Sequence, residues 1–277
     1  MPTTITVVSD LHAGSTWGLC PPEVELHEEG TYHASKYQRW LWDNWIDFWT
    51  WARELARGRR VMVINGDMVD GVHHRTTQLV STNEADHIEI ADQCIRAAVE
   101  IYRPRHIVFI RGTEVHVGAA ARDEEIIAHR WRKYVPHEKP FSRYAAFMTV
   151  EGVLFHFAHH TGGWGRPWTA TGAPGRESVI MRDYALTAHM RTGEPVEVPD
   201  VSVRAHQHRF NDSGRATHPR VIVCPAWQLS TVFGKRISPT RAPDIGGVQF
   251  VVREGKYTIE ERLYHIPGAD DARIILN

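Results

Sequence analysis

The stretch from Val61 to Asp70 constrains the fold of this 277-residue chain more than any other. Its first four residues are apolar and mostly β-branched, and a short run of this kind between turn signals is typical of a strand buried on both faces. Gly66 then permits a sharp turn, and Asp67 follows at the carboxyl end of the strand, where open α/β sheets hold their ligands. The stretch predicts an α/β fold with Asp67 at a site, although a Gly-Asp pair alone is more typical of an ordinary turn that closes a strand.

Length and composition set bounds on the class of protein. We expect one domain over residues 1–277, because the chain shows no repeat and no linker. The net charge of −1 provides no overall field that would attract nucleic acid or an anionic membrane. No stretch approaches the ~20 apolar residues of a membrane span, and Ile5–Val8 is too short for a signal peptide. Three distant cysteines indicate neither a disulfide framework nor a zinc framework, so we expect a cytoplasmic protein.

Helical periodicity is strongest in residues 34–57, where Leu41, Trp45 and Trp49 belong to one apolar stripe. Trp40, Trp42 and Trp51 lie off that stripe. We interpret the helix as core with a contact to a partner helix or subunit, which would make a homo-oligomer; an aromatic platform for stacking bases is the alternative. Residues 13–33 are expected to form a loop, which is long enough to serve as a lid over the site. Further helices are predicted over residues 85–102, 123–134 and 176–191.

Other predicted strands also end in acidic or histidine residues. Residues 3–9 and 106–110 are predicted strands, 144–150 and 153–158 a hairpin, and 201–205 a further short strand, with 221–224, 248–252 and 257–264 completing a second set. Each of these polar residues could belong to an ordinary loop, but together they mix carboxylates with imidazoles. The candidate ligands at four strand ends are Asp10, His12, Asp67, His159, His206 and His208.

This mixture of side chains indicates a metal site. Carboxylate and imidazole ligands suit Mn, Fe or Zn rather than Mg or Ca alone. Six or more ligands exceed the needs of one tetrahedral ion, so the set suggests two divalent ions that share a bridging carboxylate. We expect Mn, with Fe, Zn or Mg as alternatives.

In four short motifs the chain resembles the calcineurin-like metallophosphoesterases. The motifs are Ser9-Asp10-Leu11-His12, Gly66-Asp67-Met68-Val69-Asp70, Ala158-His159-His160 and Ala205-His206-Gln207-His208, in the order of the family. The resemblance implies a four-layer sandwich, in which helices flank two mixed β-sheets and a dinuclear site lies at the strand ends.

The resemblance also implies the role of each ligand. Asp10, His12 and His208 would hold the first ion, His159 and His206 the second, and Asp67 would bridge both. Two cations about 3.5–4 Å apart clamp a phosphoryl group and lower the pKa of a bridging water. The resulting hydroxide would attack phosphorus in line, while a nearby acid protonates the departing alkoxide.

The third motif departs from the family pattern. The family has Gly-Asn-His followed by an acid, with Asn as a ligand and His near the leaving group, whereas this chain has Gly112-Thr113-Glu114-Val115-His116. Either the site has lost both functions, or Glu114 binds the second ion and His116 donates the proton. We favour the replacement, because carboxylates bind such ions well and His is the usual acid near neutral pH. A surface salt bridge for Glu114 and an ordinary exposed His116 are the alternative.

The substrate class is the least constrained property. Residues 160–241 carry eleven basic and six acidic side chains, and three tryptophans, which favours a phosphodiester of nucleic acid or of a nucleotide. Solvated arginines on surface helices would give the same count. We expect a phosphodiesterase or nuclease. The alternatives are a phosphomonoesterase acting on small phosphates or phosphoproteins and a non-catalytic metal-stabilised scaffold; no substrate-binding residue is assigned.

Overall fold

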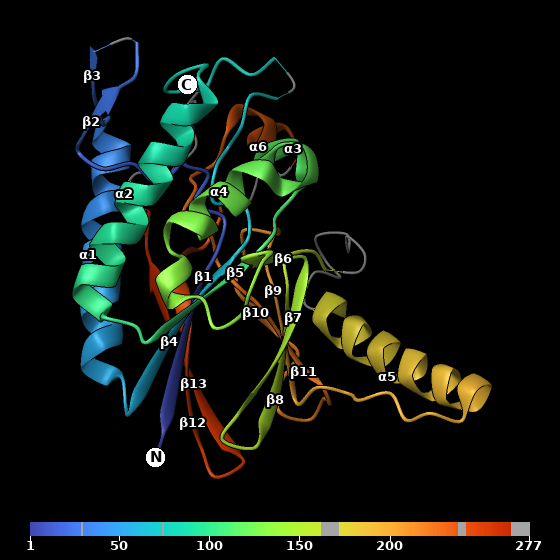
Figure 1. Cartoon of the computed structure of the whole chain (residues 1–277). Helices are drawn as coiled ribbons and strands as arrows, with labels where there is room; N and C mark the ends of the chain where they lie inside the picture. The colour runs from blue at the N-terminus through green and yellow to red at the C-terminus, as the bar shows by residue number, and fades with distance from the viewer. Residues whose placement is uncertain (29, 74, 162–171, 238–241, 267–277) are drawn as a thin grey trace, which may run out of the picture.

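Two β-sheets lie face to face, and helices cover their outer faces (Figure 1). The computed structural model describes residues 1–28, 30–73, 75–161, 172–237 and 242–266. In the first sheet, β1, β4, β5 and β6 run parallel to one another, while β12 and β13 are antiparallel to their neighbours. Its strands, in spatial order, are β13 (Lys256–Tyr264), β12 (Ile245–Arg253), β1 (Thr3–Val8), β4 (Arg59–Asn65), β5 (His106–Ile110) and β6 (Ser142–Arg143).

The second sheet is also mixed. The strands β8, β9 and β11 are parallel, and the antiparallel strands β7 and β10 lie at its two edges. Its order is β10 (Asn211–Asp212), β11 (Arg220–Val223), β9 (Val201–Arg204), β8 (Val153–Ala158) and β7 (Ala145–Val150). Glu151 and Gly152 join β7 to β8 with positive φ at both positions, which is the turn that suits a tight hairpin.

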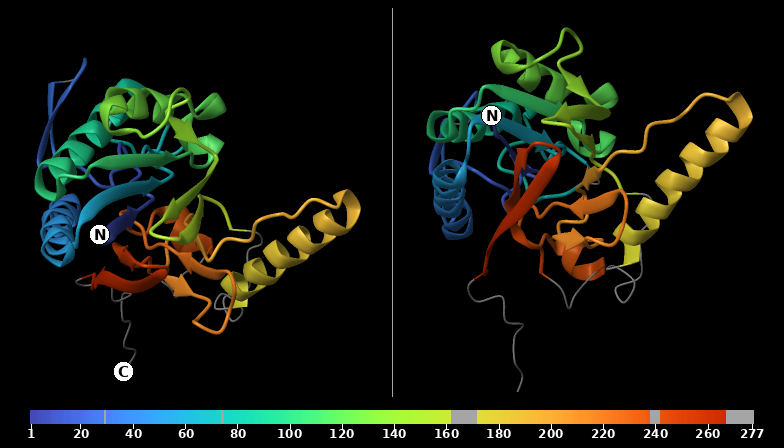
Figure 2. Two further views of the ribbon diagram at one scale, coloured as in Figure 1. Left: turned by 60° about the horizontal axis from the view of Figure 1, so that its bottom comes forward. Right: turned by 90° about the horizontal axis from the view of Figure 1, so that it is seen from below.

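Helices form the two outer layers. On the first sheet pack α1 (Lys36–Leu55) and α2 (Glu84–Tyr102), with α4 (Arg122–Arg130) against α2. On the second sheet, α5 (Gly172–Thr192) contacts β11 and then projects away from the body of the molecule (Figure 2). The expected architecture of two mixed sheets flanked by helices is therefore confirmed. Shorter elements are α3 (Glu114–Val117), α6 (Val232–Ile237) and the 3-10 turns η1 (Ala119–Ala121) and η2 (Arg132–Tyr134).

Alternation along the strands builds two separate cores. In β4, Val61 and Val63 face the second sheet, whereas Met62 and Ile64 face the helices. All four side chains are buried, because this strand is covered on both faces. The same division repeats in β5 and fixes the register of the parallel strands, since a shift by one residue would exchange the two faces.

The tryptophan-rich helix α1 belongs to the core. Its N-terminus is closed by a capping box between Ser35 and Gln38. Trp45 and Trp49 are fully buried, and Trp45 donates its indole N–H to the carbonyl of Cys94 at 3.0 Å. The off-stripe side chains Trp40, Trp42 and Trp51 are partly buried against the same cluster. The interpretation of this helix as core is confirmed, while its use in a homo-oligomer stays a prediction.

One segment differs from expectation. Residues 13–33 contain a hairpin of β2 (Glu23–Leu26) and β3 (Gly30–His33) where a loop was predicted. Only Val24 of β2 is buried, so the short strands lack the alternation that would reveal them. Within the described part of the chain, no helix has the length and apolar character needed to cross a membrane.

Candidate metal centre

The candidate ligands converge at the carboxyl ends of parallel strands. Asp10 and His12 follow β1, Asp67 follows β4, and Thr113 follows β5. Because these strands are parallel, all three segments lie at the same end of the first sheet. From the second sheet, His159 follows β8 and the His206–His208 segment follows β9. The two sheets thus deliver residues from five strand ends to one place.

The backbone at this place is strained. Five candidate ligands occupy left-handed conformations that residues other than glycine seldom adopt, each costing on the order of 1–3 kcal/mol. Such strain concentrates at functional sites because the surrounding structure must hold it there. The five residues, with their φ values, are Asp10 (53°), His12 (45°), Asp67 (51°), His206 (70°) and His208 (53°).

Two glycines bring the strand ends close together. A Cβ on Gly66 would lie 2.3 Å from Nδ1 of His159, and a Cβ on Gly112 would lie 2.1 Å from Oδ1 of Asp67. Both distances are far below van der Waals contact, so only glycine fits at these positions. Gly66 and Gly112 therefore set how closely His159 and Asp67 approach their neighbours.

One group of ligands consists of Asp10, His12 and His208. Nε2 of His12 lies 3.2 Å from Nε2 of His208, which in turn lies 3.2 Å from Oδ1 of Asp10. Nδ1 of His12 is 2.9 Å from Oδ1 of Asp70, so the Asp70 carboxylate accepts the Nδ1–H and leaves the Nε2 lone pair free for a cation. Although it is buried, Oδ1 of Asp10 accepts no well-aligned hydrogen bond from the described residues.

A second group surrounds His159. Its Nδ1–H donates to the carbonyl of Asn65 at 2.7 Å, and its Nε2 lies 3.0 Å from Oδ2 of Asp67. The ligating atoms of His159, His160 and His206 lie within 4.8 Å of one another. Like His12, His159 has one ring nitrogen held by the protein and the other directed at the shared centre.

Asp67 lies between the two groups. Its Oδ2 is 3.0 Å from Nε2 of His159, 3.9 Å from Nε2 of His12 and 3.9 Å from Nδ1 of His206. Thr113 completes its surroundings, since the Thr113 amide donates to Oδ1 at 2.6 Å and the hydroxyl donates to Oδ2 at 3.1 Å. This is the position that a bridging carboxylate must have.

Two carboxylates at the site, those of Asp10 and Asp67, are buried and ionised. Burial would raise the pKa of Asp10, but the neighbouring His208 and His159 lower it to about 2. The pKa of Asp67 is likewise held well below its ordinary value, against the effect of burial, chiefly by His159. In return, although burial opposes it, Asp67 and Asp10 raise the pKa of His159 to about 10. Two buried carboxylates therefore stay ionised, and the buried Oδ1 of Asp10 fits a divalent ion.

The two residues assigned from the unusual third motif lie apart from these groups or at their margin. Glu114 is exposed at the start of α3 and belongs to none of the ligand groups in the described chain. His116 is half-buried, with Nδ1 2.9 Å from the carbonyl of Asp70 and its ring 4.6 Å from that of His12. Burial, and then the nearby His12, lower the pKa of His116 to about 4. The ligand role of Glu114 and the acid role of His116 stay predictions.

Three further residues contact the candidate ligands or their loops, and the sequence alone did not predict these contacts. Asp70 orients His12, and His160 faces His206 with ring centroids 4.8 Å apart. Glu124 of α4 is fully buried and accepts the amides of Met68 at 3.2 Å and Gly112 at 2.7 Å. Asp70 and His160 lie inside recognised motifs, whereas nothing in the sequence around Glu124 indicates its contacts.

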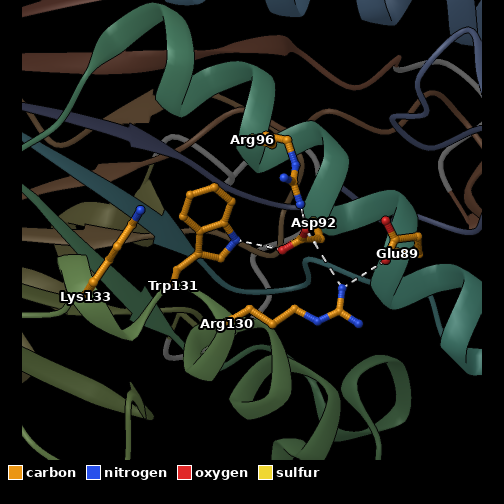
Figure 3. A pocket seen from close by; sticks show the side chains of 6 residues that line it. All are labelled: Glu89, Asp92, Arg96, Arg130, Trp131 and Lys133. Atoms are coloured by element: carbon orange, nitrogen blue, oxygen red, sulfur yellow. Dashed lines mark hydrogen bonds and ion pairs between the residues drawn. The ribbon is translucent and has the colours of Figure 1, made fainter.

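A separate cavity of about 470 Å³ lies between α2 and the α4–η2 segment and is lined by no candidate ligand (Figure 3). Asp92 is buried there and accepts the indole N–H of Trp131 and the guanidinium of Arg96, both at 2.8 Å. Arg130 lies 3.0 Å from Glu89. Four of its charged side chains, Glu89, Asp92, Arg96 and Arg130, already pair with one another, and the Arg130–Glu89 pair joins α4 to α2.

Comparison with known proteins gives distant structural likenesses. No protein-family model and no curated protein matches the chain. Among solved structures, a dimetal phosphatase from Danio rerio is 9% identical, with 94% of this chain and 96% of that chain covered and a TM-score of 0.42. Vps29 from Chaetomium thermophilum is 10% identical, with 96% and 100% covered and a TM-score of 0.40. A 5′-nucleotidase precursor from Thermus thermophilus is 14% identical, with 95% and 54% covered and a TM-score of 0.35.

Proposed function

We propose that this chain is a calcineurin-like metallophosphoesterase that hydrolyses phosphate esters with two divalent ions. The observation that carries the proposal is the position of Asp67, whose Oδ2 lies within 3.9 Å of imidazole nitrogens from His12, His159 and His206. One carboxylate oxygen between imidazoles of both ligand groups is the arrangement expected of a bridging ligand. The four motifs of the resemblance contribute these residues in the expected order.

The position of each residue indicates which ion it would bind. Asp10, His12 and His208 would hold one ion, His159 and His206 the other, and Asp67 both. Bound together, two such ions supply Lewis acidity and an activated water for in-line displacement at phosphorus. Asp70 holds Nδ1–H of His12 and the Asn65 carbonyl holds Nδ1–H of His159, so each imidazole would present the lone pair of Nε2 to an ion once the Nε2 proton is lost. His116, beside His12, stays the predicted donor of a proton to the leaving alkoxide, although burial and the nearby His12 lower its pKa to about 4, which disfavours this role at neutral pH.

Manganese is the proposed metal, and a phosphodiester the proposed substrate class. The ligand set combines carboxylates with imidazoles, which suits Mn better than Mg, an ion that prefers oxygen ligands and keeps its waters. For the substrate, support comes from the excess of basic side chains in residues 160–241, which could contact the phosphates of a nucleic acid or nucleotide. A phosphomonoester is the runner-up.

The test of the proposal is hydrolysis and metal content in the wild-type chain and Asp67→Asn. We expect Mn²⁺-dependent hydrolysis of both esters, with a higher rate for bis(p-nitrophenyl) phosphate than for p-nitrophenyl phosphate. Asp67→Asn should lose activity and bind at most one ion per chain, because both ions share this carboxylate. Asp43→Asn, at an exposed position of α1, is the matched control and should behave as wild type. Two bound ions and full activity in Asp67→Asn would refute the dinuclear site.

A second candidate function is a metal-stabilised scaffold that binds a partner protein without catalysis. It is favoured by Thr113, which stands where the family carries a ligand asparagine. The same assay separates the two functions, because the scaffold would bind both ions and hydrolyse neither ester.

A further inference from the structure

The second ligand group lacks one donor if only the family ligands are counted. Thr113 stands at the position of the asparagine, and its hydroxyl contacts Oδ2 of Asp67 at 3.1 Å, Nδ1 of His206 at 3.2 Å and Nε2 of His160 at 3.3 Å. A neutral hydroxyl is a weaker ligand than a carboxylate or an imidazole. Thr113 is thus placed to orient the donors around it, and the group needs another ligand.

We propose that His160 is this ligand and binds the second ion directly through Nε2, in place of the missing asparagine and in preference to Glu114. This inference rests on the proposed metal site, but it does not depend on the chain being an enzyme.

The distances fit a shared ion. Imidazole nitrogens bind Zn²⁺-sized ions at about 2.0–2.1 Å, so two nitrogens on one ion are at most about 4.2 Å apart. The ligating atoms of His159, His160 and His206 already lie within 4.8 Å of one another, so a modest closing movement of the side chains would bring them onto one ion. Glu114 belongs to no such group in the described chain.

The local backbone also brings the rings of His159 and His160 close enough to share an ion. Consecutive residues of a strand point to opposite faces, so His159 and His160 would diverge if β8 continued. Instead the strand ends at Ala158, and the two rings lie on the same side with centroids 5.0 Å apart. His160 remains exposed, which leaves this side of the ion open to exchange with solvent.

The experiment measures metal binding, with hydrolysis as a separate readout. Metal-free wild type, His160→Ala, Glu114→Ala and the matched control His189→Ala, an exposed histidine of α5, are titrated with Mn²⁺ by calorimetry and with Co²⁺ by visible absorption. We expect His160→Ala to weaken one of two binding events by at least about tenfold, equal to ~1.4 kcal/mol, and to change the Co²⁺ spectrum of that site. The other two variants should match wild type. Adding Thr113→Asn to His160→Ala should restore affinity by returning an amide ligand.

Three outcomes would overturn the assignment. The first is wild-type affinity for both ions in His160→Ala; if hydrolysis is lost at the same time, His160 contacts the substrate and not the ion. The second is a loss of affinity in Glu114→Ala, and the third is a single binding event in wild type. Unfolding of the metal-free variants, followed by circular dichroism, separates a lost ligand from a lost fold. If wild type binds two ions and hydrolyses no ester, the proposed function fails while the assignment of His160 is still decided by the titration.

Discussion

At the scale of single residues, the site depends on side chains that fix loops as much as on the ligands. Glu124 is the clearest case, because its two carboxylate oxygens accept one amide from the loop after β4 and one from the loop after β5. Burial, together with the charge of Asp67, raises the pKa of Glu124 to about 8. Burial therefore disfavours the ionised form of Glu124. Its two hydrogen bonds nevertheless hold the segments that carry Asp67 and Thr113.

Replacing Glu124 by glutamine should uncouple these loops. A glutamine offers one acceptor oxygen where two buried amides need one each, and an unsatisfied buried donor costs about 1–3 kcal/mol. We expect Glu124→Gln to lower the free energy of unfolding by this amount, measured by urea denaturation of the metal-free protein above pH 8, where Glu124 is ionised, and to weaken metal binding. Glu114→Gln, at an exposed position, is the control for stability. Unchanged stability and metal affinity in Glu124→Gln would show that the loops hold their positions without this carboxylate.

Residue types and spacing pointed to the candidate ligands, but not to the residues that surround them. Asp10, His12 and Asp67 could be recognised because each follows a run of apolar residues. Glu124 could not, since its position on α4 has the pattern of any half-buried helix and its partners are backbone amides, which carry no signature in the sequence. His160 was visible as half of a histidine pair, yet only the turn after β8 reveals that both rings face the same side.

At the scale of elements, α5 is attached to the second sheet through a buried charged group. Arg204 of β9 is 4% exposed and lies 3.1 Å from Oε1 of Glu177 on α5 and 3.1 Å from Nδ1 of His156 on β8. Burial, and then the charge of Arg204, lower the pKa of His156 to about 4. The neutral imidazole accepts a hydrogen bond from the guanidinium, whereas a protonated one would place two positive charges side by side.

This arrangement predicts a loss of stability in mild acid. The pKa of His156 is lower in the folded chain than its ordinary value of 6.5, so the unfolded chain binds the proton first as the pH falls. The contribution is fully present above pH 6.5 and is lost as the pH falls from there toward 4. In His156→Gln, which keeps an acceptor but does not titrate, we expect a smaller drop in melting temperature between pH 7 and pH 4.5. Parallel melting curves of wild type and variant over this range would contradict the assignment.

The elements themselves were predictable where packing sets their pattern. The stripe of α1 and the apolar runs of β4 and β5 are dictated by burial on one or both faces, and the structure has them where expected. The β2–β3 hairpin escaped prediction because its strands pair with each other and bury little, so no periodicity marks them.

At the scale of the whole molecule, the candidate metal centre joins the two sheets. Its ligands come from β1 and β4 on one side and from β8 and β9 on the other, so ions held there would cross-link the halves of the sandwich. Without ions, the described part of the chain balances the negative charges of Asp10 and Asp67 chiefly with imidazoles such as the protonated ring of His159. Bound metal should therefore stabilise the entire fold.

Metal addition is expected to raise the melting temperature measurably. Free Mn²⁺ at about 100 times its dissociation constant stabilises the folded state by about 2.7 kcal/mol for each site. For one site in a chain of this size, that corresponds to a rise of roughly 5 °C. Differential scanning calorimetry with Mn²⁺, and again after excess chelator, measures this shift. The Asp67→Asn variant should show a smaller rise, and an equal rise in both proteins would place the stabilising ions elsewhere.

The left-handed backbone at five candidate ligands also determines which substitutions would accumulate at these positions during evolution. Glycine or asparagine would relieve strain at Asp10, His12, Asp67, His206 and His208, so mutation toward them is favoured by stability and opposed only by loss of the ligand. A descendant released from metal binding should accumulate these replacements early, before its core changes. In homologous chains, an aspartate or histidine retained at a left-handed position would thus be a sign of continuing selection on the metal site.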